Sequence, residues 1–152
     1  MNGNLKCHKD PMKLRPVISH VNAPMSRGSK WAATQLSSCK GLISQAPVRD
    51  TRDFYEKVRH SKAKGRLLSL DVKSLFTNIP VDEAIEVVRS HSTGPNPTFS
   101  LQVNPEIFCE ILKVCLSFNQ FSFNGKYYRQ IAGVPMGSSL SPAMANIYKE
   151  HF

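Results

Sequence analysis

The spacing of apolar and polar residues changes along the chain and predicts a mixture of strands and helices. An apolar run at residues 67–70 has the length of a short buried strand and would deliver Asp71 to its carboxyl end. Open sheets usually place their chemistry at that end of a strand. Pro80 interrupts the extended pattern, and residues 81–90 follow as a helix with an acidic first turn. A carboxylate in the position of Asp71 is either a metal ligand or a solvated turn residue.

Helical spacing recurs in four further segments, and cap residues mark where some of them begin. Ser29 can cap the first, and Asn104 followed by Pro105 is a favourable start for the third. We expect these helices at about residues 30–41, at about residues 50–60, from Pro105 to about Phe118, and from Ser141 to residue 152. The apolar positions predict the buried faces. They are Trp31, Leu36 and Cys39 in the first helix, and Ile107, Ile111, Val114 or Cys115, and Phe118 in the third.

Residues 120–130 predict a β-hairpin. Apolar residues alternate ahead of the turn, and Asn124-Gly125 suits a type I′ turn. Gly133 and Gly137 follow shortly after the hairpin, and because they have no side chain they allow the backbone to approach another group closely.

A basic segment at the start of the chain precedes a predicted strand over residues 14–19. Pro16 favours an edge position there, because proline cannot donate to a β-ladder. Four cations cluster around this strand, namely Lys6, Lys9, Lys13 and Arg15. They either keep an exposed edge soluble or contact a triphosphate or a nucleic-acid backbone.

Positive charge is concentrated in the first part of the chain. The formal net charge is +9, with 14 Lys/Arg and 4 Asp/Glu in residues 1–66 but 6 Lys/Arg and 7 Asp/Glu in residues 67–152. This asymmetry indicates either a solvated basic face or a basic front half that handles phosphate, and we favour the second interpretation.

The cysteines and the hydropathy pattern indicate in which cellular compartment the protein lies. The four cysteines, Cys7, Cys39, Cys109 and Cys115, lack zinc-site spacing and indicate ordinary thiols in a reducing, intracellular compartment. No apolar run reaches the roughly 18 residues of a membrane span, so we expect no membrane partner. The polar N-terminus lacks the apolar stretch of a signal peptide.

Several segments, in the right order, resemble reverse transcriptases, and specifically those of Penelope-like retroelements. Residues 5–9 (LKCHK) with 14–19 (LRPVIS) resemble the fingers segment, 71–80 (DVKSLFTNIP) resemble polymerase motif A, and 123–142, ending in GVPMGSSLSP, resemble a hairpin followed by motif B. The motif A and motif B matches are specific together. The first segment departs from the family pattern, which commonly has Pro between Leu5 and Lys6 and Pro in place of Lys13.

The resemblance implies a fold and a reaction. The implied fold is α+β, an incomplete right-hand polymerase with a fingers-like part in residues 1–66 and a partial palm in residues 67–152. The family's reaction is RNA-directed DNA synthesis from deoxynucleoside triphosphates on an RNA template and a DNA primer. The family's motif C, a hairpin with two adjacent Asp residues, has no counterpart in this sequence. We therefore expect a chain truncated before motif C and inactive alone; the alternative is a non-catalytic basic remnant that binds nucleic acid.

The resemblance also implies roles for individual motif A residues. Asp71 and the Val72 carbonyl would hold Mg²⁺ in the complete enzyme, which uses two ions about 4 Å apart. Backbone N–H groups near Ser74 and Leu75 would face the triphosphate. Phe76 would exclude a ribose 2′-OH, unless it is only a packing residue.

Further roles fall on motif B and on the basic segment. Met136 and Gly137 would lie under the templating base pair, where a side chain at Gly137 would collide with substrate. Lys13 and Arg15 would bind the incoming triphosphate, and together with Lys6 and Lys9 they would contact nucleic acid.

Overall fold

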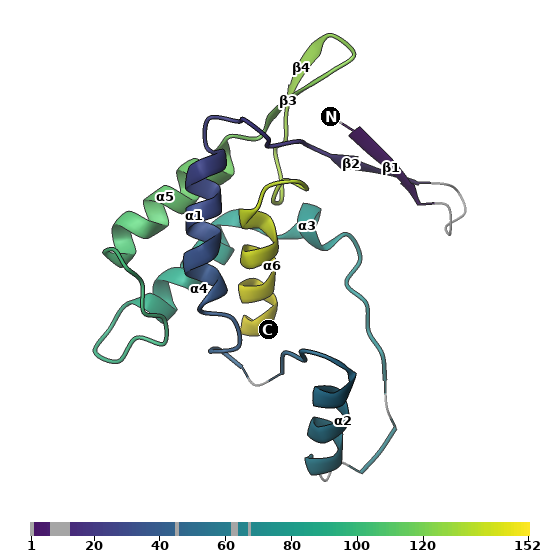
Figure 1. Cartoon of the computed structure of the whole chain (residues 1–152), viewed down its shortest axis with the longest axis vertical. Coiled ribbons are helices and arrows are strands. Elements are labelled where there is room, and N and C mark those ends of the chain that lie inside the picture. Colours follow the sequence, from purple (N-terminus) through teal and green to yellow (C-terminus); the bar gives the residue numbers. More distant parts are fainter. Residues whose placement is uncertain (1, 7–12, 45, 62–63, 67) are drawn as a thin grey trace.

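Four helices form the core of the molecule. The computed structural model describes residues 2–6, 13–44, 46–61, 64–66 and 68–152. Helices α1 and α4 each pack against both α5 and α6, which closes a four-helix cluster (Figure 1). The four are α1 (Ser26–Ser37), α4 (Val81–Ser92), α5 (Pro105–Ser117) and α6 (Leu140–His151).

Shorter elements surround this cluster. They are β1 (Asn2–Lys6), β2 (Lys13–Val17), α2 (Thr51–His60), α3 (Leu75–Asn78), β3 (Gln120–Phe123) and β4 (Lys126–Arg129). The strands form two separate antiparallel ribbons, β1 with β2 and β3 with β4. Pro16 lies opposite Gly3 in the first ribbon, which suits a residue that cannot donate a ladder hydrogen bond. The fold is therefore a mixture of helices and small sheets, as expected for the α+β class at this coarse level.

Local sequence signals place several elements correctly. Asn104 caps α5 as predicted, by accepting a hydrogen bond from the Glu106 N–H at 2.9 Å. Asn124 and Gly125 have φ angles of 49° and 72°, so both adopt the left-handed backbone that a type I′ turn needs. These predictions succeed because the signals act within a few residues.

The start of α1 differs from the prediction. The helix begins at Ser26, and Met25 occupies its cap position without a side-chain hydrogen bond. Ser29, the predicted cap, instead lies inside the first turn, where its N–H donates to the Met25 carbonyl at 2.8 Å and its side chain is buried. Tertiary packing of this turn overrides the cap preference.

Apolar side chains between the four helices form the core. Leu36 and Cys39 are buried as predicted, and the half-buried Trp31 ring meets Phe108 edge-to-face, with 5.7 Å between ring centroids. Three described cysteines are free and buried, and burial raises the pKa of each thiol. They are Cys39, Cys109 and Cys115.

The predicted strand at residues 67–70 is wrong where the structure describes it; Leu67 lies outside the described residues. Residues 68–70 form no strand, and the side chains of Leu68 and Leu70 are 87% and 93% exposed. A strand needs a neighbour to complete its ladder, and no strand pairs with this segment within the described part of the chain. The apolar run therefore stays in water.

The predicted inner face of α5 is wrong in part. Ile107, Val114 and Phe118 are 59%, 44% and 40% exposed. The fully buried face consists instead of Phe108, Cys109, Leu112, Cys115 and Leu116, so the Cys115 alternative was right, and Ile111 is half-buried against the core as predicted. Most of this helix is apolar, so two stripes at helical spacing compete for the core. The contact with Trp31 on α1 decides between them in favour of the stripe that carries Phe108.

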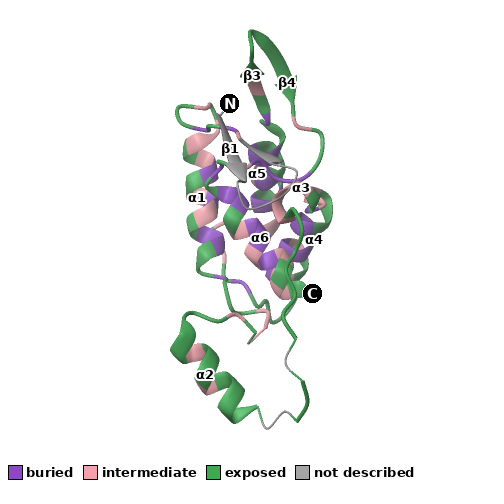
Figure 2. Cartoon of the chain, turned by 90° about the vertical axis from the view of Figure 1, so that its right-hand side faces the viewer, coloured by how far each residue is buried: buried purple, intermediate pink, exposed green. Residues whose placement is uncertain are grey.

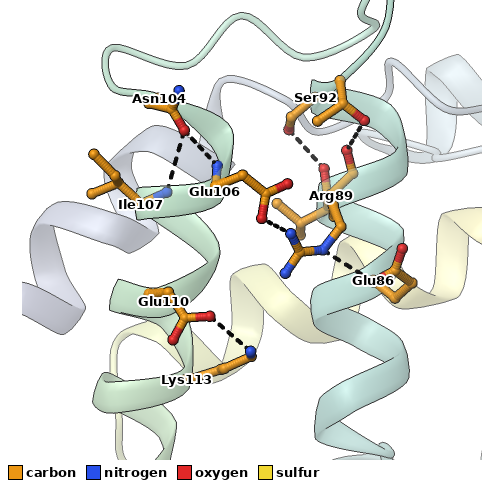
Figure 3. A network of polar contacts seen from close by, with 10 residues as sticks. Glu86, Arg89, Ser92, Asn104, Glu106, Ile107, Glu110 and Lys113 are labelled. Atoms are coloured by element: carbon orange, nitrogen blue, oxygen red, sulfur yellow. Dashed lines mark hydrogen bonds and ion pairs between the residues drawn. The ribbon is translucent and has the colours of Figure 1, made fainter.

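Charged side chains join the outer surfaces of α4 and α5. The Arg89 guanidinium, on α4, lies between the Glu86 carboxylate at 3.1 Å and the Glu106 carboxylate on α5 (Figure 3). On α5, Lys113 pairs with Glu110 at 2.8 Å. Such exposed ion pairs contribute little stability, and of these three pairs it is Arg89–Glu106 that joins the two helices.

Helix α2 stands apart from the core. It has no buried residue, and it contacts no other helix or strand among the described elements (Figure 2). Phe54 and Tyr55 are 50% and 60% exposed on its surface. None of the described helices is long and apolar enough to cross a membrane.

Candidate active site

Residues 71–78 form a surface turn that carries the motif A carboxylate. Asp71 and Val72 are exposed in extended chain, and Ser74 adopts left-handed backbone at φ 55° before the short helix α3. Thr77 fixes the turn, because its N–H and hydroxyl donate to the Ser74 carbonyl at 3.2 and 3.0 Å. Asn78 adds a side-chain bond to the Lys73 carbonyl at 3.1 Å. These hydrogen bonds fix residues 73–78, which directly follow the exposed Asp71 and Val72.

The same turn is anchored to the core by the residues that follow Ser74. Leu75 and Phe76 are half-buried and pack against the apolar cluster, and Ile79 is fully buried. Phe76 therefore has a packing role in this structure. That role leaves its proposed part in sugar selection open, because the ring is not wholly enclosed.

The motif B loop docks against motif A. The Val134 N–H donates to the Phe76 carbonyl at 2.7 Å. Gly133 is buried and has a φ angle of 69°. A Cβ added to it would collide with the Phe76 carbonyl oxygen and would lie 2.6 Å from the Thr77 Cα. Only glycine permits this approach, because a real Cβ does not come so near another atom.

The far end of the same loop docks against the strand that carries the basic cluster. The Ile18 N–H donates to the Met136 carbonyl at 2.8 Å. Gly137 has φ 120°, and an added Cβ would lie 3.0 Å from the Ile18 carbonyl carbon and closer still to its oxygen. The Ser141 hydroxyl donates to the Pro135 carbonyl at 2.7 Å and holds the centre of the loop to α6.

The motif B loop, residues 133–137, therefore contacts two segments that are distant from it in the sequence. One is motif A, and the other is Ile18, which directly follows β2. Sequence reasoning named Met136 and Gly137 for contact with substrate, and that role stays a prediction. It did not identify Ile18 as the partner of this loop. The glycines were the only available signal, because the contacts are made by backbone atoms.

The basic cluster lies on the ribbon that this contact holds. Lys6 and Lys13 are opposite each other in the register of β1 and β2, and Arg15 is opposite Asn4. Lys9, named with them, lies outside the described residues. The ribbon continues directly into Ile18, so the strand with the predicted triphosphate cations is attached next to motif B.

The residues present supply only part of a two-ion site. Within the described ranges no three His, Cys, Asp or Glu side chains lie close enough to hold a metal ion together. Asp71 is thus a single exposed carboxylate, whereas in-line phosphoryl transfer by two Mg²⁺ ions needs several. The described residues do not by themselves fit the metal pair that the family uses, and we derive no catalytic step from them alone.

Comparison with known proteins identifies the family. A family model described as reverse transcriptase (RNA-dependent DNA polymerase) matches residues 7–152. The chain therefore belongs to the reverse transcriptase family. No curated protein and no solved structure matches it.

Proposed function

We propose that this chain is the fingers and partial palm of a Penelope-like reverse transcriptase, with motif A at residues 71–80 and motif B at residues 133–142. The observation that supports this most is the convergence of both motifs and β2 on one loop, through the Val134–Phe76 and Ile18–Met136 hydrogen bonds. A domain with incidental sequence similarity would not need to bring these three segments together.

In this proposal, different residues bind the metal ion and the triphosphate during nucleotide addition. Asp71 and the Val72 carbonyl would hold Mg²⁺ in the complete enzyme, and backbone groups at Ser74 and Leu75 would face the triphosphate. Lys13 and Arg15, which lie on β2, would offset the negative charge of the triphosphate. The bound metal pair, completed by carboxylates from another strand, would supply Lewis-acid stabilisation of the attacking and leaving oxygens.

Further carboxylates are therefore required, and this requirement gives the test. Primer extension with Mg²⁺ or Mn²⁺ is measured for the 152-residue chain and for a chimera completed with a relative's hairpin of adjacent Asp residues. We expect the chain alone to give no more signal than its Asp71→Ala variant. In the chimera we expect extension that Asp71→Asn lowers by about a hundredfold or more, whereas Asp82→Asn leaves it unchanged.

Two outcomes would contradict this assignment. Asp71-dependent extension by the chain alone would mean that other carboxylates in these residues complete the site. A chimera that binds RNA and primer but shows no Asp71-dependent extension would leave the alternative, a non-catalytic basic remnant that binds nucleic acid.

Phe76 is the proposed barrier to ribonucleotides. In the active chimera, Phe76→Ala should raise ribonucleotide relative to deoxyribonucleotide incorporation by about tenfold, because the discrimination would be steric. Leu75→Ala is the matched control, since Leu75 is also half-buried against the core. Equal ratios in both variants, with activity retained, would assign Phe76 to packing alone.

A further inference from the structure

The β3–β4 hairpin projects from the helical core without packing against it. The two strands contact each other but no other described helix or strand (Figures 1 and 2). A hydrogen bond from the Gln130 N–H to the Asn119 carbonyl, 3.1 Å long, closes its base. Both faces of the hairpin are therefore open to solvent along most of their length.

One face of this hairpin carries most of its aromatic rings. Phe121 pairs with Tyr128 and Phe123 pairs with Lys126, so these four side chains share a face. The Phe121 and Tyr128 rings lie 5.5 Å apart at an interplanar angle of 18°, a nearly parallel stack. Phe123 and Tyr128 are 55% and 44% exposed. We call these four side chains the aromatic face. The opposite face carries Tyr127, which is 89% exposed.

The stretch of sequence that contains the aromatic face carries positive charge. No Asp or Glu occurs between Glu110 and Glu150, while this stretch contains Lys113, Lys126 and Arg129. Lys126 lies on the same face as the exposed rings, whereas the carboxylate of Asp82 lies with Arg129 at the base of the hairpin. The combination matches a polyanion whose units carry flat aromatic groups.

We propose that the aromatic face binds single-stranded nucleic acid, with bases stacking on Phe123 and the Phe121–Tyr128 pair and a phosphate contacting Lys126. This site lies on a different ribbon from the Lys6–Arg15 cluster and requires no catalytic carboxylate. It rests on the proposed function only in one respect, which is that the bound nucleic acid would be the template of the polymerase. Stacking tolerates any base, so the site would have little sequence preference.

The test measures binding of a fluorescein-labelled oligouridine RNA of about 12 nucleotides to the 152-residue chain by fluorescence anisotropy at several salt concentrations. Phe123→Ala should weaken binding roughly tenfold, and Phe123→Trp should retain it. Tyr127→Ala, the matched control on the opposite face, should stay within about twofold. Lys126→Gln should lower the log–log salt slope by about 0.7, the share of one phosphate contact on a single strand.

A measurement on the unaltered protein guards against variants that misfold. RNA containing 4-thiouridine is photocrosslinked to the chain, and we expect the crosslinked peptide to contain residues 120–129. Crosslinks confined to other peptides, or equal affinity in all variants, would overturn the hairpin site without affecting the proposed polymerase function. Absence of RNA binding would overturn it too, as would hairpin variants that change only the oligomeric mass measured by light scattering.

Discussion

Replacing Gly137 with alanine should lower the free energy of unfolding by about 3 kcal/mol. Two effects combine. At φ 120° an L-residue is strained, and its Cβ would enter the space occupied by the Ile18 carbonyl group. Either the Ile18–Met136 hydrogen bond breaks or the loop moves away from β2. Gly133→Ala should cost about as much, because its Cβ would meet the backbone of Phe76 and Thr77.

Alanine substitutions at two other glycines serve as controls, because they add backbone strain without a steric collision. Gly94 has φ 100° and Gly41 has φ 80°, and a Cβ added to either meets no atom within 4 Å. Gly94→Ala and Gly41→Ala should therefore show the backbone strain alone, about 1–2 kcal/mol. Urea denaturation followed by circular dichroism gives all four values. If Gly137→Ala and Gly133→Ala cost no more than these controls, the motif B loop is not clamped as the structure shows.

Phe108→Ala should be the most damaging core substitution, with a loss of about 3–5 kcal/mol of stability. Phe108 is fully buried on α5, and its ring contacts Trp31 on α1. Removing the ring leaves a cavity between these two helices. Because the protein contains one tryptophan, Trp31 fluorescence should also change in the folded variant.

Ile107→Ala is the matched control on the neighbouring position of the same helix. Ile107 is 59% exposed, so its truncation should change stability by less than about 1 kcal/mol. Comparable losses at Ile107 and Phe108 would mean that α5 buries the stripe expected from the sequence. The pair therefore tests which face of this helix packs against the core.

The fold was predictable where short-range chemistry decides it. The Asn124-Gly125 turn and the Asn104 cap each follow from a few neighbouring residues. The face of α5 and the run at 67–70 depend on distant partners instead. Nothing local shows that Phe108 meets Trp31, or that no strand among the described residues pairs with Leu68 and Leu70.

The candidate site was predictable only in part, for a related reason. The resemblance to polymerase motifs A and B predicts Asp71, Phe76 and Gly137 as one set of site residues. The contact of Gly137 with Ile18 joins two backbone segments more than a hundred residues apart, and backbone groups are the same at every position. A glycine shows that something approaches closely, but the sequence contains no sign of what it is.

The isolation of α2 has an evolutionary consequence. Because the four-helix cluster closes without it, selection for a well-packed interior does not constrain its residues. Its cations and the exposed Phe54 and Tyr55 can be substituted during evolution at little cost to stability. Any resistance of this helix to change between species would therefore have to come from what its surface meets in the cell.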